Sequence, residues 1–207
     1  MSIQDIFNAV LAFDAETAKA KTQEELDAGT DVETILNDGL IGAMDEVGER
    51  FSAGDLFVPE MLVAAQAMKA GLEILKPHLA SGQSRSKGTV VIGTVKGDLH
   101  DIGKNLVAMM MEGAGFDVVD VGVDIDSETF VKTAAEKDAD VIALSALLTT
   151  TMPAMEATVK AVKEAGMTVK TIIGGAPVTQ AFSDQIGADG YSADAPGAVK
   201  LIKEIIA

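Results

Sequence analysis

The stretch Gly93-Thr94-Val95-Lys96-Gly97-Asp98-Leu99-His100-Asp101-Ile102-Gly103-Lys104-Asn105 lies where an apolar run ends and a helical pattern begins. It places an aspartate, Asp98, two residues before a histidine, His100. A histidine that binds a metal through one ring nitrogen usually donates its other N–H to a carboxylate, which fixes the tautomer and makes the ligating nitrogen more basic. The pattern therefore predicts a metal ligand, His100, with Asp98 as its orienting partner.

Around this stretch, short runs rich in β-branched residues alternate with amphipathic helical runs as far as the end of the chain. Repeated alternation with continuous apolar strands predicts a parallel sheet covered by helices on both faces. Five such units indicate an α/β domain of the Rossmann-like (flavodoxin-like) type. The predicted strands are 89–95, 117–121, 141–144, 168–173 and 188–191, and the predicted helices are 103–112, 127–137, 153–165, 177–185 and 196–206.

The preceding part of the chain has helix-type periodicity and no convincing alternating strand. Helix-stopping signals at Asp14, Gly29-Thr30-Asp31, Gly54-Asp55 and Pro77 divide it into four predicted helices. The small and polar segment 80–88 suits an exposed connection between domains. We therefore predict an all-α domain over residues 1–86 and the α/β domain over residues 87–207.

In parallel α/β sheets, ligands bind outside the carboxyl ends of the strands. Asp98 and His100 follow the first predicted strand, Ser145 ends the third, and Gly174-Gly175-Ala176 ends the fourth. An aspartate after a first strand also occurs in phosphoacceptor domains, but these need an acidic cluster, a hydroxyl and a lysine around magnesium. A single histidine cannot complete a closed zinc site, which normally has four protein ligands. The metal would have to bring most of its own coordination sphere, as it does in a macrocycle.

Three motifs carry a family resemblance. The segment Asp98-x-His100-x-x-Gly103 resembles the signature of cobalamin-binding domains, Ser145-Ala146-Leu147 resembles the Ser-x-Leu of that family, and Gly174-Gly175 resembles its Gly-Gly. The all-helical amino-terminal region is similar as well. The chain as a whole resembles the corrinoid proteins of methyltransferase systems in methanogens and acetogenic anaerobes, and it is similar to the cobalamin-binding module of methionine synthase.

The resemblance implies a cobalamin or related corrinoid cofactor, with methylcobalamin as its methyl-bearing form. It implies that His100 is the lower axial ligand of cobalt, with Asp98 and Thr151 forming a proton relay behind it; Thr151 stands where the family has a serine. The helical domain would be a cap that shields the upper face of the corrin. The cofactor-binding residues that the resemblance implies are Gly97, Asp98, Leu99, His100, Asp101, Ile102, Gly103, Ser145, Leu147, Thr149, Gly174, Gly175 and Ala195, together with Phe51, Val58 and Met61 of the cap.

The function implied by the resemblance is that of a methyl carrier which is not catalytic alone. Cobalt(I) would accept a methyl group from a substrate-specific methyltransferase, and methyl-cobalt(III) would hand it to a second methyltransferase. The donor could be methanol, a methylamine, glycine betaine or a methoxylated aromatic compound, and the acceptor tetrahydrofolate or a thiol coenzyme. A reductive activator protein would be a third partner.

Two alternatives share the same binding domain: a cobalamin-dependent sensor or regulator, and the small subunit of a cobalamin-dependent mutase. Composition restricts the partners further. With a formal net charge of −16, the chain has no basic footprint for nucleic acid or an anionic membrane. It contains no cysteine, and its amino terminus does not resemble a signal peptide. We therefore predict a cytoplasmic protein that binds neither nucleic acid nor membrane.

Overall fold

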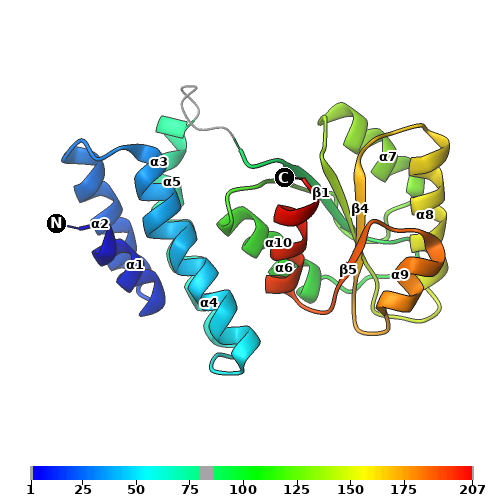
Figure 1. Ribbon diagram of the computed structural model, residues 1–207, viewed down its shortest axis with the longest axis horizontal. Coiled ribbons are helices and arrows are strands. Elements are labelled where there is room, and N and C mark those ends of the chain that lie inside the picture. The colour runs from blue at the N-terminus through cyan, green and yellow to red at the C-terminus, as the bar shows by residue number, and fades with distance from the viewer. Residues whose placement is uncertain (1, 80–85, 207) are drawn as a thin grey trace. The chain divides into compact units, whose positions relative to one another are not determined.

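The computed structural model describes residues 2–79 and 86–206. The chain forms two compact units, one built mostly from residues before Lys87 and the other mostly from Lys87 onward (Figure 1). Most of the predicted polar connection, residues 80–85, lies outside the described residues. Within the described ranges, no helix has both the length and the apolar character needed to cross a bilayer.

The first unit is entirely helical. Its elements are α1 (Ile3–Leu11), α2 (Ala15–Asp27), α3 (Val32–Thr34), the π-helix η1 (Ile35–Ile41), α4 (Gly42–Ala53) and α5 (Val58–Leu79). Thr34 and Ile41, at the two junctions around η1, both have α-helical backbone angles, so α3, η1 and α4 form one continuous helix. The predicted four-helix arrangement is therefore confirmed.

Capping residues explain three of the four predicted helix boundaries. The side chain of Asp14 accepts a hydrogen bond from the backbone of Thr17, and Asp31 does the same for Thr34. Gly54 ends α4 with a φ of 83°, in the left-handed region that glycine adopts without a steric penalty. The fourth prediction is wrong: α5 continues through Pro77 to Leu79. Pro77 has no N–H for the carbonyl four residues earlier and its ring crowds that carbonyl, and the helix ends two residues after it rather than at it.

The second unit is a parallel sheet with helices on both faces (Figure 1). The strand order is β2-β1-β3-β4-β5, the flavodoxin-like order, so the predicted fold class is confirmed. Helices α6 and α10 cover one face of the sheet, and α7, α8 and α9 cover the other. The elements are β1 (Thr89–Thr94), α6 (Ile102–Gly113), β2 (Asp117–Asp120), α7 (Ser127–Glu136), β3 (Val141–Ser145), α8 (Met152–Glu164), β4 (Lys170–Gly174), α9 (Gln180–Ile186), β5 (Gly190–Ser192) and α10 (Ala195–Ile205).

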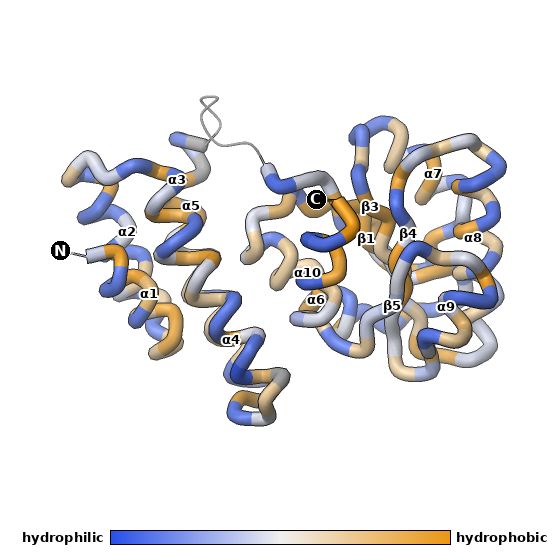
Figure 2. Tube along the Cα trace, viewed as in Figure 1, coloured by the Kyte–Doolittle hydropathy of each residue, from blue (hydrophilic) through white to orange (hydrophobic). Residues whose placement is uncertain are grey.

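The core of this unit lies on both faces of the central strands. Val91, Ile142 and Ile173 pack with Phe130 of α7 and Met155 of α8 in one buried cluster. Neighbouring strand residues point to the opposite face, because side chains alternate along a strand, and they are buried there as well. Figure 2 shows the resulting pattern, with hydrophobic residues concentrated in the strands and hydrophilic residues recurring along the helices.

Three elements begin later than the sequence predicts. β5 starts at Gly190 rather than at residue 188, because its parallel pairing with β4 begins where Ile172 meets Gly190. β4 starts at Lys170 rather than at residue 168, because its parallel pairing with β3 begins where Val141 meets Lys170. Helix α9 starts at Gln180 rather than at residue 177, because Thr179 caps it by accepting a hydrogen bond from Phe182 N–H. In each case a specific hydrogen-bonded contact sets the boundary more sharply than the hydrophobic pattern does.

The carboxyl ends of β3 and β4 approach each other closely at Gly175. The φ of Gly175 is +130°, and a Cβ atom there would overlap the carbonyl oxygen of Ala146, which is backbone and cannot rotate away. The amide of Ala146 donates to the carbonyl of Gly174 at 3.2 Å, so the two strand ends remain hydrogen-bonded past the last paired residues. Glycine at position 175 is therefore required by packing between two backbones.

Gly175→Ala is expected to lower the free energy of unfolding of the α/β unit by about 2–4 kcal/mol, because it combines a backbone clash with an unfavourable φ. Gly166→Ala is the matched control, since Gly166 also has a positive φ, +66°, but no atom within 4 Å of an added Cβ. The control should lose only about 1 kcal/mol. Urea unfolding can be followed by the fluorescence of Tyr191, the single tyrosine of a chain without tryptophan. Equal losses in the two variants would contradict the clash.

Candidate functional site

The candidate site lies at the point where the strand order of the sheet reverses direction. The chain leaves β1 toward β2 on one side and later crosses back to β3 on the other side of β1. The loops that follow β1 and β3 therefore diverge and leave a crevice, which is the usual place for a ligand in an open α/β sheet. Asp98 and His100 come from the first loop, and Leu147, Leu148 and Thr151 come from the second.

A tight turn over residues 95–98 places Asp98 at the carboxyl edge of the sheet. Asp98 N–H donates to the carbonyl of Val95 at 3.1 Å, and Gly97 between them has a φ of +84°. This conformation favours glycine, which explains its position directly before the aspartate. The turn carries the Asp98 side chain inward, where it has no exposed surface.

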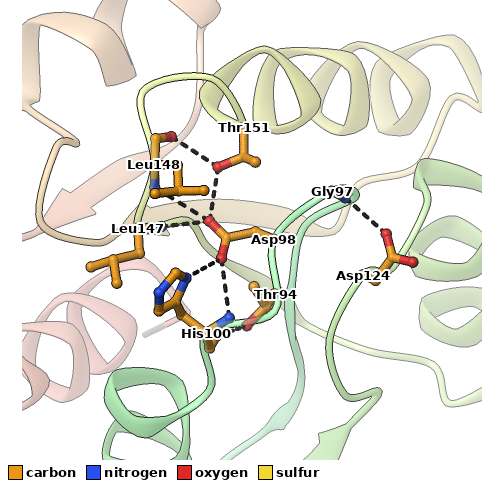
Figure 3. A network of polar contacts seen from close by, with 8 residues as sticks. All are labelled: Thr94, Gly97, Asp98, His100, Asp124, Leu147, Leu148 and Thr151. Carbon is orange, nitrogen blue, oxygen red and sulfur yellow. Dashed lines mark hydrogen bonds and ion pairs between the residues drawn. The ribbon is translucent and has the colours of Figure 1, made fainter.

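Both carboxylate oxygens of Asp98 accept hydrogen bonds, from five donors in all (Figure 3). Oδ1 accepts from the backbone N–H of His100 at 3.1 Å and faces its Nδ1 at 2.9 Å. Oδ2 accepts from the backbone N–H groups of Leu147 at 2.8 Å and Leu148 at 3.3 Å, and from Oγ1 of Thr151 at 2.8 Å. The loops after β1 and β3 are thus joined through one carboxylate.

These donors keep Asp98 ionised. Burial by itself would raise the pKa of Asp98, but the hydrogen bonds from Leu147, His100 and Thr151 outweigh it and hold the pKa well below the usual range of an aspartate. An ionised carboxylate can only accept hydrogen bonds. The hydrogen between Asp98 and His100 therefore resides on Nδ1 of the imidazole.

The remaining ring nitrogen of His100, Nε2, is not engaged by the described residues. None of the hydrogen bonds among the described residues uses Nε2, and the His100 side chain is 54% exposed. The backbone of His100 is also held, because Oγ1 of Thr94 donates to its carbonyl oxygen at 2.8 Å. An imidazole whose Nδ1 is held by a carboxylate and whose other nitrogen makes no contact within the described residues is suited to bind a metal through that nitrogen.

Large apolar side chains are exposed in the same two loops. Leu99 is 72% and Ile102 81% exposed, and Leu147 and Leu148 are each 42% exposed. These four account for more than half of the exposed large hydrophobic residues among the described part of the chain. Contiguous exposed apolar surface usually marks a binding site. An exposed imidazole with apolar neighbours fits a metal held in a broad, largely apolar ring.

The other cofactor-binding residues that the resemblance implies for the α/β unit lie at the same edge of the sheet. Ser145 and Gly174 end β3 and β4 and are partners in register. Gly103, in the first turn of α6, has no atom within 4 Å of an added Cβ, so the space beside it is open. Thr149 is exposed, whereas Ala195 is buried at the start of α10. At Gly175 the missing side chain admits the backbone of Ala146 and leaves no open space.

The three residues predicted to shield the cofactor from above all belong to the helical unit. Phe51 of α4 is half-buried, and Val58, the first residue of α5, is 41% exposed. Met61 has no exposed surface in this structure. Two neighbours that the sequence analysis did not select, Phe57 and Val63, are also exposed large hydrophobic residues. The start of α5 therefore has its own apolar surface.

The sequence analysis missed two groups of contributors. The backbone N–H groups of Leu147 and Leu148 cannot be recognised from residue type, because every residue other than proline has such a group. Asp124 was also missed, although its carboxylate accepts a hydrogen bond from Gly97 N–H at 2.8 Å (Figure 3). Its only signal in the sequence is an acidic residue shortly after the second strand, which many exposed loops contain.

Comparison with known proteins gives matches over both units. Residues 88–200 match a family model described as B12 binding domain, and residues 2–76 match a second model with the same description. Trimethylamine corrinoid protein 2 from Methanosarcina acetivorans is 46% identical over 203 residues, which cover 96% of this chain and 94% of that protein. Dimethylamine corrinoid protein 1 from the same organism is 44% identical and covers 99% and 97%.

A solved structure agrees over the full length as well. The methanol:cobalamin methyltransferase complex from Methanosarcina barkeri contains a chain that is 31% identical, with a TM-score of 0.88 over 99% of this chain and 79% of that chain. The sheet order, the site at its carboxyl edge and these matches define a protein that binds a B12-type cofactor. The chain belongs to the corrinoid proteins of methyltransferase systems. The resemblance drawn from the three motifs is confirmed, and so is the predicted cofactor, cobalamin or a related corrinoid.

Asp98→Asn is expected to destabilise the α/β unit by about 2–4 kcal/mol at pH 7, because an amide cannot accept all five hydrogen bonds and leaves buried donors without partners. The pKa of Asp98 is lower in the folded than in the unfolded chain. Its ionisation therefore contributes stability above the unfolded pKa of about 4, and this contribution is lost as the pH falls below that value. Urea unfolding of both proteins between pH 7 and pH 3 should show the difference shrinking in acid. A constant difference would contradict the assignment.

Thr151→Val is expected to cost about 1–2 kcal/mol of unfolding free energy, because it keeps the shape of the side chain but removes the hydroxyl that donates to Asp98. Thr151→Ser keeps that hydroxyl and removes one methyl group, so its loss should stay below about 1 kcal/mol. Urea unfolding at pH 7 compares the two. If the serine variant were the less stable one, the methyl group rather than the hydrogen bond would be the important part of Thr151.

Proposed function

We propose that this protein is a methyl carrier whose cofactor cobalt is ligated from below by Nε2 of His100. The observation that carries the proposal is the arrangement around Asp98, which fixes Nδ1–H of His100 and leaves Nε2 exposed among apolar side chains. When bound, the corrinoid supplies a cobalt centre that can receive a methyl group and release it again. The protein's own residues hold, orient and shield that centre.

We assign the residues that would hold the cofactor by their place in the two loops. Leu99, Ile102 and Leu147 are exposed beside His100, so they would contact the lower face of the ring. Gly97 and Asp101 flank the Asp98–His100 pair in the same loop. The nucleotide tail would enter beside Gly103, Ser145, Thr149, Gly174, Gly175 and Ala195, which all lie at the carboxyl edge of the sheet.

The relay behind His100 would be formed by Asp98 and Thr151. The Thr151 hydroxyl lies 2.8 Å both from Oδ2 of Asp98 and from the carbonyl oxygen of Leu148, and it has one hydrogen to give. When the hydroxyl donates its hydrogen bond to Asp98, the carboxylate is stabilised and the imidazole is held more firmly. A rotation of this single hydroxyl would weaken that support without moving the backbone.

The upper face of the corrin would be shielded by residues of the helical unit. Val58 and Phe51 keep exposed apolar surface, as such a role requires. The buried Met61 would act from beneath them, by supporting the start of α5. Shielding matters because a reduced cobalt centre is exposed to unwanted oxidation whenever it is open to solvent.

We infer that the partners are two methyltransferases and a reductive activator. The relatives are named for trimethylamine and dimethylamine, and the related structure is a complex with a methanol:cobalamin methyltransferase. A methylamine or methanol is therefore the favoured methyl donor, and the substrate itself would be held by the first enzyme. The acceptor of the second enzyme would be tetrahydrofolate or a thiol coenzyme.

The two alternative functions are not favoured. The full-length relatives are corrinoid proteins of methylamine systems, and the related complex acts on methanol. None of these names describes a regulator or a mutase subunit. Methyl transfer is the function common to this group.

The absorption spectrum of the protein loaded with cobalamin tests the role of His100. The wild type should show the histidine-on spectrum, and His100→Ala should show only the histidine-off form, because alanine has no atom that can ligate cobalt. His78→Ala is the matched control, since the chain contains two histidines and His78 lies outside the candidate site. It should keep the wild-type spectrum.

The same proteins, with the cofactor first reduced to cobalt(I) by an added chemical reductant in the absence of oxygen, can then be offered trimethylamine, dimethylamine or methanol together with the corresponding methyltransferase. The wild type should become methylated with one of these donors, and His100→Ala should do so at a reduced rate. A wild type that retains no cobalamin, or a spectrum that His100→Ala leaves unchanged, would refute the ligation. A loaded protein that accepts no methyl group from any donor would refute the carrier function.

A further inference from the structure

A second polar cluster lies beside the loop that follows β1, on the side of β2. It is formed by the β2–α7 connection, residues 121–126. Thr94 N–H donates to the carbonyl of Gly122 at 2.9 Å, and Ile125 N–H donates to the carbonyl of Thr94 at 3.0 Å. Val95 and Ile125 form an isolated parallel bridge. The connection is therefore held in register along the extension of β1.

Asp124 of this connection contacts residues 96–98 of the ligand loop, which is the segment 95–101 between β1 and α6. Its Oδ1 accepts from Gly97 N–H at 2.8 Å, and its Oδ2 pairs with Nζ of Lys96 at 3.1 Å. Its own N–H donates to the carbonyl of Asp98 at 3.0 Å. Figure 3 shows Asp124 opposite Gly97, on the far side of the loop from Leu147 and Thr151.

The backbone at Asp124 is in an unusual conformation that suits this contact. Its φ is +57°, in the left-handed region that residues other than glycine adopt rarely and that aspartate and asparagine tolerate best. The hydrogen bond from Gly97 and the ion pair with Lys96 lower the pKa of Asp124, so its carboxylate stays ionised. Both oxygens of the ionised carboxylate can therefore accept hydrogen bonds from the loop.

The other end of the ligand loop is anchored to the same part of the chain. Lys104, in the first turn of α6, is buried, and its ammonium group pairs with Asp120 at the end of β2. It also donates to Oδ1 of Asn105 at 2.7 Å. Asp120 in turn accepts from the backbone N–H of Gly122 at 2.9 Å. A buried ammonium group that has such partners is strongly destabilised when they are removed, so this end is firmly held.

We propose that Asp124 is a positioning residue for His100. It does not touch the imidazole; it fixes Lys96, Gly97 and the carbonyl of Asp98, and thereby sets where the Asp98 carboxylate meets Nδ1. The Lys104–Asp120 pair fixes the backbone after His100, as Asp124 fixes the backbone before it, and both contacts come from the β2 side of the loop. The metal-ligating role of His100 in this inference rests on the proposed function, whereas the orientation of the ring does not.

Three variants separate the carboxylate from its backbone and from general stability. Asp124→Gly removes the side chain while accepting the positive φ without strain. Asp124→Asn also tolerates this φ and keeps an oxygen that can accept from Gly97, but it loses the charge that pairs with Lys96. Asp126→Ala is the matched control: it removes the cap that Asp126 provides to Thr129 at the start of α7, and within the described residues the Asp126 side chain makes no hydrogen bond to the loop that follows β1.

Two measurements report on the position of His100. In the cofactor-free protein, the ¹⁵N shifts of the imidazole report how much of the ring carries its hydrogen on Nδ1, and amide exchange reports the bond at Gly97. In the cobalamin-loaded protein, the absorption spectrum gives the ratio of histidine-on to histidine-off forms. Asp124→Gly should raise the exchange rate at Gly97 about tenfold, mix the two ring tautomers and lower the histidine-on ratio about tenfold.

Asp124→Asn should fall between the wild type and the glycine variant, and Asp126→Ala should match the wild type in the tautomer and the ratio. The inference is overturned if Asp124→Gly leaves the tautomer population and the histidine-on ratio at wild-type values. It is also overturned if Asp126→Ala changes these two quantities as much as Asp124→Gly does. The measurements without cofactor do not depend on ligation. If wild type and His100→Ala have identical spectra, the proposed function fails, while the tautomer in Asp124→Gly still decides whether Asp124 positions the ring.

Discussion

An ionised carboxylate in a protein interior is unfavourable unless hydrogen-bond donors replace the water it has lost, and Asp98 has five of them. The donors come from its own loop and from the loop after β3, so satisfying one charge brings together segments about fifty residues apart in the chain. The same bonds orient the imidazole of His100. Stability of the sheet edge and geometry of the site therefore have a common physical origin.

The rest of the site follows from what surrounds that carboxylate. At most protein surfaces polar groups face the solvent and apolar groups lie inside, but here the ionised Asp98 is buried and Leu99 and Ile102 are exposed. The reversal is consistent with a ligand that is a metal in a broad ring. The metal needs one well-oriented nitrogen, and the ring needs apolar contact around it. Because the ring would cover this surface, the exposure of Leu99 and Ile102 need not persist in the loaded protein.

Thr151 shows which part of a side chain this site requires. The family pattern has a serine at this position, yet the threonine hydroxyl reaches Asp98 at 2.8 Å and the residue remains buried. Its extra methyl group lies near Gly97, 3.6 Å from where a Cβ atom at Gly97 would stand, which is an ordinary van der Waals distance. Glycine at position 97 is therefore explained by the positive φ of the tight turn and not by the branched residue. The contact depends on the hydroxyl group, which serine and threonine share.

Much of this protein could be inferred from residue order alone. Strand and helix alternation, the four helices before it, and Asp98 and His100 as candidate site residues follow from local patterns: periodicity, capping residues, and residue types close together in the chain. Thr151 came only from the resemblance to cobalamin-binding proteins, because it is 53 residues from Asp98 in the sequence. Two of the exceptions were also local, because α5 continues through Pro77 and Thr179 delays the start of α9. The late starts of β4 and β5 depend instead on pairing with a neighbouring strand.

Other features depend on segments that are distant in sequence. The backbone donors of Leu147 and Leu148 have no residue signature, and the need for glycine at position 175 comes from the carbonyl of Ala146 on another strand. Asp124 is an ordinary loop residue until folding brings it against Gly97. Residue types and spacing are properties of the chain, whereas the partner of a backbone group is chosen only when separate segments pack together.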